Sequence, residues 1–163
     1  MEQYILSVNL SFSRTQEFIS YWMPPILFGF SILALSGDLG SGKNTLLLVK
    51  WALAWIPSLS RHQIIMINFY LRKTVHVMSY GILYYLWFRA YQGHLRYGLP
   101  KAFVWSLGLC VLVALLDEGH QALLLSRTGR LADVVLDSAG STLGAMLTFA
   151  FWTPRPTAAP PER

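Results

Sequence analysis

Four apolar runs separated by short polar segments dominate the chain and predict membrane-spanning helices. A helix needs about 20 mostly apolar residues to cross the hydrocarbon core of a bilayer. The first run has no charged residue, and the other three carry their charges mainly near the ends. We therefore predict spans at about residues 18–37, 73–91, 101–121 and 133–152.

The segment between the first two runs, residues 44–71, is predicted to lie in the headgroup layer. Trp51 and Trp55 are four positions apart and share one face of a helix, while Lys50 interrupts the apolar sequence. Tryptophan is enriched at the membrane interface, where amphipathic helices of this kind lie. Asn44 is a residue type that favours the N-cap of such a helix.

The predicted fold class is all-α: an integral membrane bundle of about four transmembrane helices, with an amphipathic interfacial helix in the first loop. Ser13 and Gln16 match a capping box that would open the first helix. At 163 residues one domain is expected, and it would cover residues 1–153. The proline-rich tail, residues 154–163, is predicted to be disordered.

Composition supports a membrane protein and argues against a separate soluble domain. Charged residues make up 13% of the chain, against roughly a quarter in soluble domains. The net charge of +5 is scattered along the sequence, so membrane lipids are expected partners and nucleic acid is not. Basic loops favour the cytoplasmic side, and the basic connection from Arg89 to Lys101 therefore predicts cytoplasmic termini.

The stretch GDLGSGKNT, from Gly37 to Thr45, nearly matches a nucleotide-binding loop. Asn44 stands where that loop needs a hydroxyl group for magnesium, and the stretch follows an apolar helix instead of a buried strand. We therefore expect no nucleotide. The glycines are expected to let the chain turn sharply out of the bilayer, with Lys43 among lipid phosphates.

Acidic residues cluster late in the chain, and the predicted topology brings them together with basic residues. Half of the eight acids lie between positions 117 and 137. The second and fourth spans begin on the side of the membrane where the third ends, so these charges converge. They form polar stripes, which should face one another because a charge near the hydrocarbon costs about 2.5–3.5 kcal/mol. The stripes are Lys73, His76, Tyr80 and Tyr84; Asp117 and Gln121; and Asp133, Asp137, Gly140 and Gly144.

A polar pocket between these helices is the predicted functional site. Its candidate acid or base residues are Glu118, Asp117 and His76, because carboxylates and imidazoles can move protons. Arg and Lys side chains hold anionic groups such as phosphate. The candidate substrate-binding residues are Arg72, Lys73, Tyr80, Gln121, Arg127, Asp133 and Asp137. Gly140 and Gly144 form a GxxxG pattern, which permits close helix packing.

Two alternatives use the same part of the chain. The four acids balance four basic residues, as in a purely structural network of ion pairs; the basic residues are Arg72, Lys73, Arg127 and Arg130. A metal site would draw on residues without any fixed ligand spacing such as HExxH, so neither a metal nor another cofactor is expected. The residues of that second alternative are Asp117, Glu118, His120 and His76.

Two stretches resemble the VanZ-like family of small multi-span bacterial membrane proteins. RKTVHVMSYGIL resembles the motif that opens the family's second helix, and DEGHQALLLSRTGRLADVVLDSAGSTLG resembles its acidic segment. The resemblance covers Arg72 to Gly144. It implies a multi-pass protein of the bacterial cytoplasmic membrane, and the family's namesake is associated with resistance to the glycopeptide teicoplanin. The resemblance implies no particular reaction for this chain, because no established reaction of the family can be carried over.

The function expected from these observations is binding or modification of an anionic lipid, or of a lipid-linked precursor, at the polar pocket. In that function Lys73 and Arg127 would hold the anion, and Glu118 or Asp117 would act as acid or base. A non-enzymatic subunit of a membrane complex is the alternative from another class, with other membrane subunits as partners. A transporter with a proton relay would use the same acids, but no internal repeat is visible.

Overall fold

The computed structural model describes residues 2–38, 40–124 and 129–152, and these ranges contain five α-helices and no strand. The predicted all-α fold is therefore confirmed. The predicted tail, residues 154–163, lies outside the described residues. The helices are α1 (Glu2–Leu35), α2 (Gly42–Ala52), α3 (Arg61–Gly93), α4 (Leu99–Ala122) and α5 (Leu131–Ala150).

Helix α3 is the centre of the bundle and contacts each of the other four helices. The core forms around its apolar and aromatic face, where Tyr80, Leu83 and Tyr84 are completely or almost completely buried. These residues recur at intervals of three and four, the spacing that brings side chains onto one helical face. Cys110 of α4 and Ala145 of α5 complete the same cluster.

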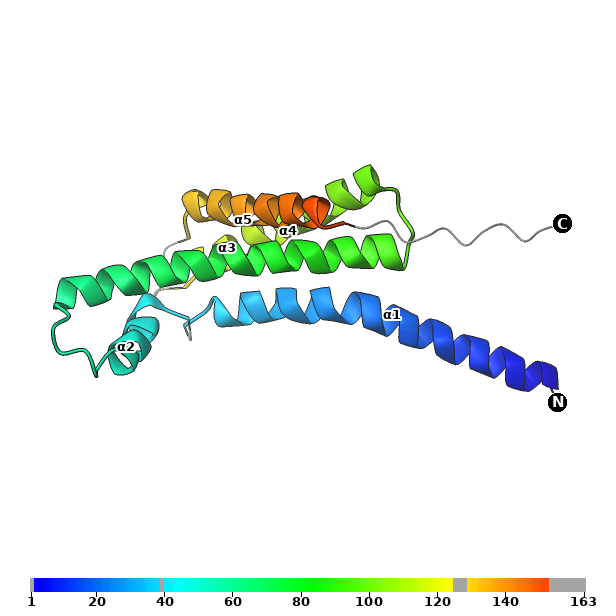
Figure 1. The fold of residues 1–163 in the computed structure, drawn as a ribbon, viewed down its shortest axis with the longest axis horizontal. Coiled ribbons are helices and arrows are strands. Elements are labelled where there is room, and N and C mark those ends of the chain that lie inside the picture. The colour runs from blue at the N-terminus through cyan, green and yellow to red at the C-terminus, as the bar shows by residue number, and fades with distance from the viewer. Residues whose placement is uncertain (1, 39, 125–128, 153–163) are drawn as a thin grey trace.

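The helices run back and forth, so that parts far apart in the sequence meet at one end of the bundle. Figure 1 shows that α1 ends, α2 lies and α3 begins at this end, where α5 also begins. The connection between α3 and α4 lies at the opposite end (Figure 1). This arrangement agrees with the antiparallel order expected from the sequence, and it gathers the charged residues into one region.

Helix α3 and helix α5 cross at glycines. A Cβ atom added to Gly144 would lie 2.7 Å from the Cα atom of Gly81, and one added to Gly140 would lie 2.8 Å from the Cα atom of Val77. No real side chain tolerates such distances to a neighbouring backbone. The absence of side chains at these positions lets the two helices approach closely enough for charged groups to pair across them.

Helix starts differ from those expected. Helix α1 begins at Glu2 and continues through Ser13, so the predicted capping box at Ser13 is wrong. The capping box lies instead at Ser60 and Gln63, where each side chain bonds the other residue's backbone N–H at the start of α3. Ser41, not Asn44, caps α2: its hydroxyl accepts a hydrogen bond from the Asn44 backbone N–H.

Residues 44–71 are divided between two helices, and the headgroup-layer position predicted for them stays a prediction. Helix α2 ends at Ala52, and residues 61–71 are the first three turns of α3. The capping box at Ser60 accounts for this division, because it ends the preceding loop and satisfies the first N–H groups of a new helix. Trp51 and Trp55 are strongly exposed, at 81% and 77%.

Two helical segments in the described part of the chain are long and apolar enough to cross a membrane, Arg14–Leu35 and Leu99–Ala122. The four-span bundle is therefore not confirmed, and the spans at residues 73–91 and 133–152 stay predictions. A physical reason is visible in the sequence of α5: Asp133 and Asp137, which belong to the charged region, lower its mean hydropathy.

Candidate functional site

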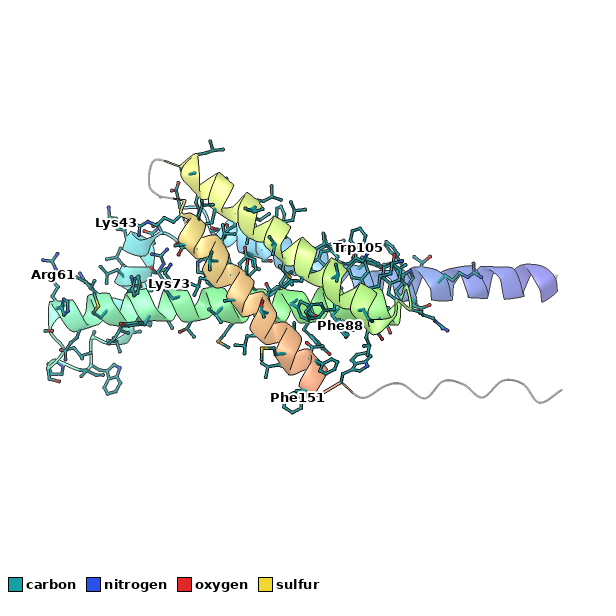
Figure 2. All side chains as sticks on the ribbon, turned by 90° about the horizontal axis from the view of Figure 1, so that it is seen from above. Lys43, Arg61, Lys73, Phe88, Trp105 and Phe151 are labelled. Atoms are coloured by element: carbon teal, nitrogen blue, oxygen red, sulfur yellow. The ribbon has the colours of Figure 1, made fainter. Side chains whose placement is uncertain are left out.

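A polar pocket of about 590 Å³ opens where the start of α2, the middle of α3, the end of α4 and the start of α5 meet. Among its described lining residues, four are Lys or Arg and one is acidic. Figure 2 shows Lys43 and Lys73 on the same side of the bundle, toward the start of α5. The lining residues are Ser41, Gly42, Lys43, Phe69, Arg72, Lys73, His76, Gln121, Arg130 and Asp133.

Two contacts between charged or titratable groups join α3 to α5 beside this pocket. Lys73 forms an ion pair with Asp133, and both side chains are partly exposed. One turn further along both helices, Nδ1 of His76 lies 3.1 Å from Oδ1 of Asp137, whose side chain is completely buried. A carboxylate held against one ring nitrogen orients the imidazole, so that the other nitrogen can exchange a proton.

Asp117, near the end of α4, lies beside His76 and Asp137. Its side chain is completely buried. One of its carboxylate oxygens lies within 4.8 Å of a ring nitrogen of His76 and of a carboxylate oxygen of Asp137. Ser36 and Gln121 are neighbours of this carboxylate, but Gln121 donates its hydrogen bonds to the Ser36 hydroxyl and to Glu118. Among the described residues neither Asp117 oxygen has a hydrogen-bond partner of acceptable geometry.

Glu118, the neighbour of Asp117, points to a different place. Its Oε2 accepts a hydrogen bond of 2.7 Å from the backbone N–H of Arg130, and its Oε1 accepts one of 3.3 Å from Gln121. Arg130 immediately precedes α5, so Glu118 ties the end of α4 to the start of α5. Both oxygens are occupied and Glu118 does not line the pocket, which favours a structural role over the acid or base role expected from the sequence.

We expect Glu118→Ala to lower the stability of the protein by about 1–3 kcal/mol, because it leaves the Arg130 N–H without its acceptor. Glu118→Gln keeps an acceptor oxygen and should cost much less. Thermal unfolding followed by circular dichroism in a mild detergent measures the difference. If the two variants unfold at the same temperature, the tie to Arg130 is not what Glu118 contributes; an acid or base role predicts instead that Glu118→Gln loses function while folding normally.

The structure brings most of the predicted site residues together, in two layers. Arg72, Lys73, His76, Gln121 and Asp133 line the pocket. Behind them are the fully or nearly fully buried residues Asp117, Glu118, Asp137 and Tyr80. Arg127, predicted to hold an anion, lies outside the described residues.

The glycine-rich stretch was not among the predicted site residues, although Ser41, Gly42 and Lys43 form one wall of the pocket. The guanidinium of Arg72 occupies the space beside Gly42: a Cβ atom added there would lie 2.8 Å from Nη1. The glycine therefore makes room for a cation. No local pattern signals this contact, because it joins residues 30 positions apart in the chain through the folding back of α2 onto α3.

A larger groove of about 1390 Å³ runs along α3 and α5 toward the opposite end of the bundle. Apolar side chains such as Val77, Ile82 and Leu147 line much of it, with Arg89 and Arg96 near the connection between α3 and α4. Its charged lining residues are Glu17, Arg89 and Arg96, and it shares no described lining residue with the polar pocket.

The fold and the site together define an α-helical protein with helices suited to a membrane and a basic pocket at one end of its bundle. The chain matches the VanZ/LLP1 family over residues 15–152, and it belongs to this family. The match confirms the resemblance carried by residues 72–144 and extends it to the first two helices. Searches of the curated proteins and of the solved structures gave no match.

Proposed function

We propose that this protein binds the phosphate-bearing headgroup of an anionic lipid, or of a lipid-linked precursor, in the polar pocket. The observation that carries the proposal is the charge of the lining: four basic side chains face a space of about 590 Å³ that has one carboxylate on its wall. Lys73 is already paired with that carboxylate, which leaves three cations for a ligand among the described lining residues. The three are Lys43, Arg72 and Arg130.

The start of α2 adds a second source of positive potential. The first N–H groups of a helix have no intrahelical acceptor, and the helix dipole places partial positive charge there. Ser41 and Gly42, at this helix start, lie on the pocket wall. Backbone N–H groups at a helix start and a nearby guanidinium are a frequent combination for holding phosphate oxygens.

A membrane location supports a lipid as the source of the phosphate. Large apolar side chains are exposed along α1, α4 and α5, among them Phe30, Val104 and Met146 at 65–69%. Soluble monomers rarely expose apolar surface on this scale. In the proposed topology the protein is multi-pass in the bacterial cytoplasmic membrane, and the basic connection between α3 and α4 lies with both termini in the cytoplasm. The pocket then lies at the outer headgroup layer.

We expect Arg72→Gln to weaken the binding of phosphatidylglycerol roughly 10-fold or more, because a hydrogen bond to a charged group contributes about 1.5–3 kcal/mol. The measurement is a titration of the purified protein in non-ionic detergent, followed by native mass spectrometry. Phosphatidylcholine, whose headgroup has no net charge, should bind more weakly to the unmodified protein. Glycerol 3-phosphate should compete if the phosphate itself is recognised.

Arg61→Gln is the matched control. Arg61 is the exposed first residue of α3 and is not part of the pocket lining, and Figure 2 shows it farther along the bundle than Lys43 and Lys73. Both variants remove one positive charge from the same helix. Equal weakening by the two variants would show a general attraction to anionic lipid and would overturn the proposed site.

A further inference from the structure

We propose that His76, Asp117 and Asp137 bind a divalent transition-metal ion. The three residues come from α3, α4 and α5, and one ligand atom from each lies within 4.8 Å of the other two. The ligand spacing along the sequence follows no known motif, which is why the sequence led us to expect no metal. Three helices that converge at one point can supply such ligands without any fixed spacing.

The distance between His76 and Asp137 suits two ligands of one ion. Nδ1 and Oδ1 are 3.1 Å apart, and two atoms that each lie about 2.0–2.2 Å from a zinc ion are separated by roughly 2.8–3.6 Å when the angle at the ion is about 90–109°. The ion would take the place of the proton between these atoms. Asp117 would then close the site from α4.

The unpaired oxygens of the cluster are suited to a cation. Asp117 and Asp137 are both completely buried, and in the described part of the chain three of their four carboxylate oxygens have no hydrogen-bond partner. An ionised carboxylate without a partner is expensive to bury. Lys73 pairs with Asp133. A divalent cation would neutralise the two buried carboxylates and would give their oxygens a partner.

The donor set selects the kind of metal. One imidazole nitrogen and two carboxylate oxygens suit Zn²⁺ or Mn²⁺, whereas Mg²⁺ and Ca²⁺ prefer oxygen ligands alone. Three protein ligands leave at least one coordination position open. His76 also lines the polar pocket, with 26% of its side chain exposed, so a ligand in the pocket would reach the ion beside this residue.

The test is metal binding by the intact protein in detergent, without added anionic lipid. After incubation with Zn²⁺ or Mn²⁺ and removal of the excess, we expect about one ion per chain by elemental analysis. Added metal should also raise the unfolding temperature, because it binds the folded state. Co²⁺ should produce visible absorption bands from direct nitrogen and oxygen ligation, a signal that does not depend on any variant.

Asp117→Asn should abolish stoichiometric binding and the rise in unfolding temperature, while Glu17→Gln, which removes an exposed acid of α1, should leave both unchanged. If Asp117→Asn does not fold, Asp137→Asn and the Co²⁺ spectrum of the unmodified protein decide the question. The proposal is overturned if the unmodified protein retains no ion and gives no Co²⁺ bands, or if Asp117→Asn binds metal as well as the unmodified protein. This result is independent of phosphatidylglycerol binding, so the two proposals can fail separately.

Discussion

Replacing Gly140 and Gly144 together by alanine will prevent the accumulation of folded protein. The two added methyl groups would fall 2.8 Å from the Cα atom of Val77 and 2.7 Å from the Cα atom of Gly81. Backbone atoms of α3 cannot move aside as the end of a side chain can, so α5 must shift away from α3. Overpacking of this kind typically costs about 1–3 kcal/mol for each site, and here it would also separate Lys73 from Asp133 and His76 from Asp137.

Gly108→Ala is the control that makes the result specific. Gly108 is an exposed residue of α4, and a Cβ atom added there meets nothing within 4 Å. Alanine in place of glycine in a helix interior is favourable by about 1 kcal/mol, so this variant should be as stable as the unmodified protein or more stable. Size-exclusion chromatography and thermal unfolding in mild detergent report both effects. Opposite signs for the same substitution are expected, and equal behaviour would contradict the close crossing of α3 and α5.

Much of the site could be predicted from the sequence because helical periodicity determines which residues share a face. Lys73, His76 and Tyr80 on α3 were predicted to face Asp133 and Asp137 on α5, and the structure places these stripes against each other. The reason is general: charged residues on apolar helices have few low-energy positions other than against each other.

The roles of adjacent residues could not be predicted in this way. Asp117 and Glu118 are neighbours in the sequence, and both were candidates for an acid or base. Successive residues on a helix point about 100° apart, so one faces His76 and Asp137 while the other faces the start of α5. The orientation of α4 about its own axis decides between them, and that orientation depends on packing against the other helices.

Local signals were also misread where the same pattern occurs twice. Ser13 with Gln16 and Ser60 with Gln63 have the same capping-box spacing, but only the second begins a helix. Pro57 and the polar residues around Ser60 mark a break in the chain, whereas no such break precedes Ser13.

The contact of Gly42 with Arg72 could not be predicted from any local signal, since it follows from the fold alone.

Removing the charge of Lys73 and removing the charge of Asp133 will have opposite effects on the binding of an anionic lipid. Lys73→Met removes a cation from the pocket and leaves Asp133 on its wall, so phosphatidylglycerol should bind roughly 10-fold or more weakly. Asp133→Asn removes the one acidic side chain among the described lining residues and releases the Lys73 ammonium. Phosphatidylglycerol should then bind more tightly than to the unmodified protein, as measured by the same titration in detergent.

This pair of variants separates a binding site from a purely structural network, because both variants break the same contact. Each should lower the stability only modestly, by about 1 kcal/mol or less, since both side chains are partly exposed. If the ion pair serves only to hold α3 to α5, lipid binding should fall in both variants in proportion to the loss of stability. A change of the same sign in both variants would therefore exclude the pocket as the lipid site. Opposite signs show that binding follows the charge of these side chains, and an Arg61→Gln variant that binds like the unmodified protein shows that the effect is local to the pocket.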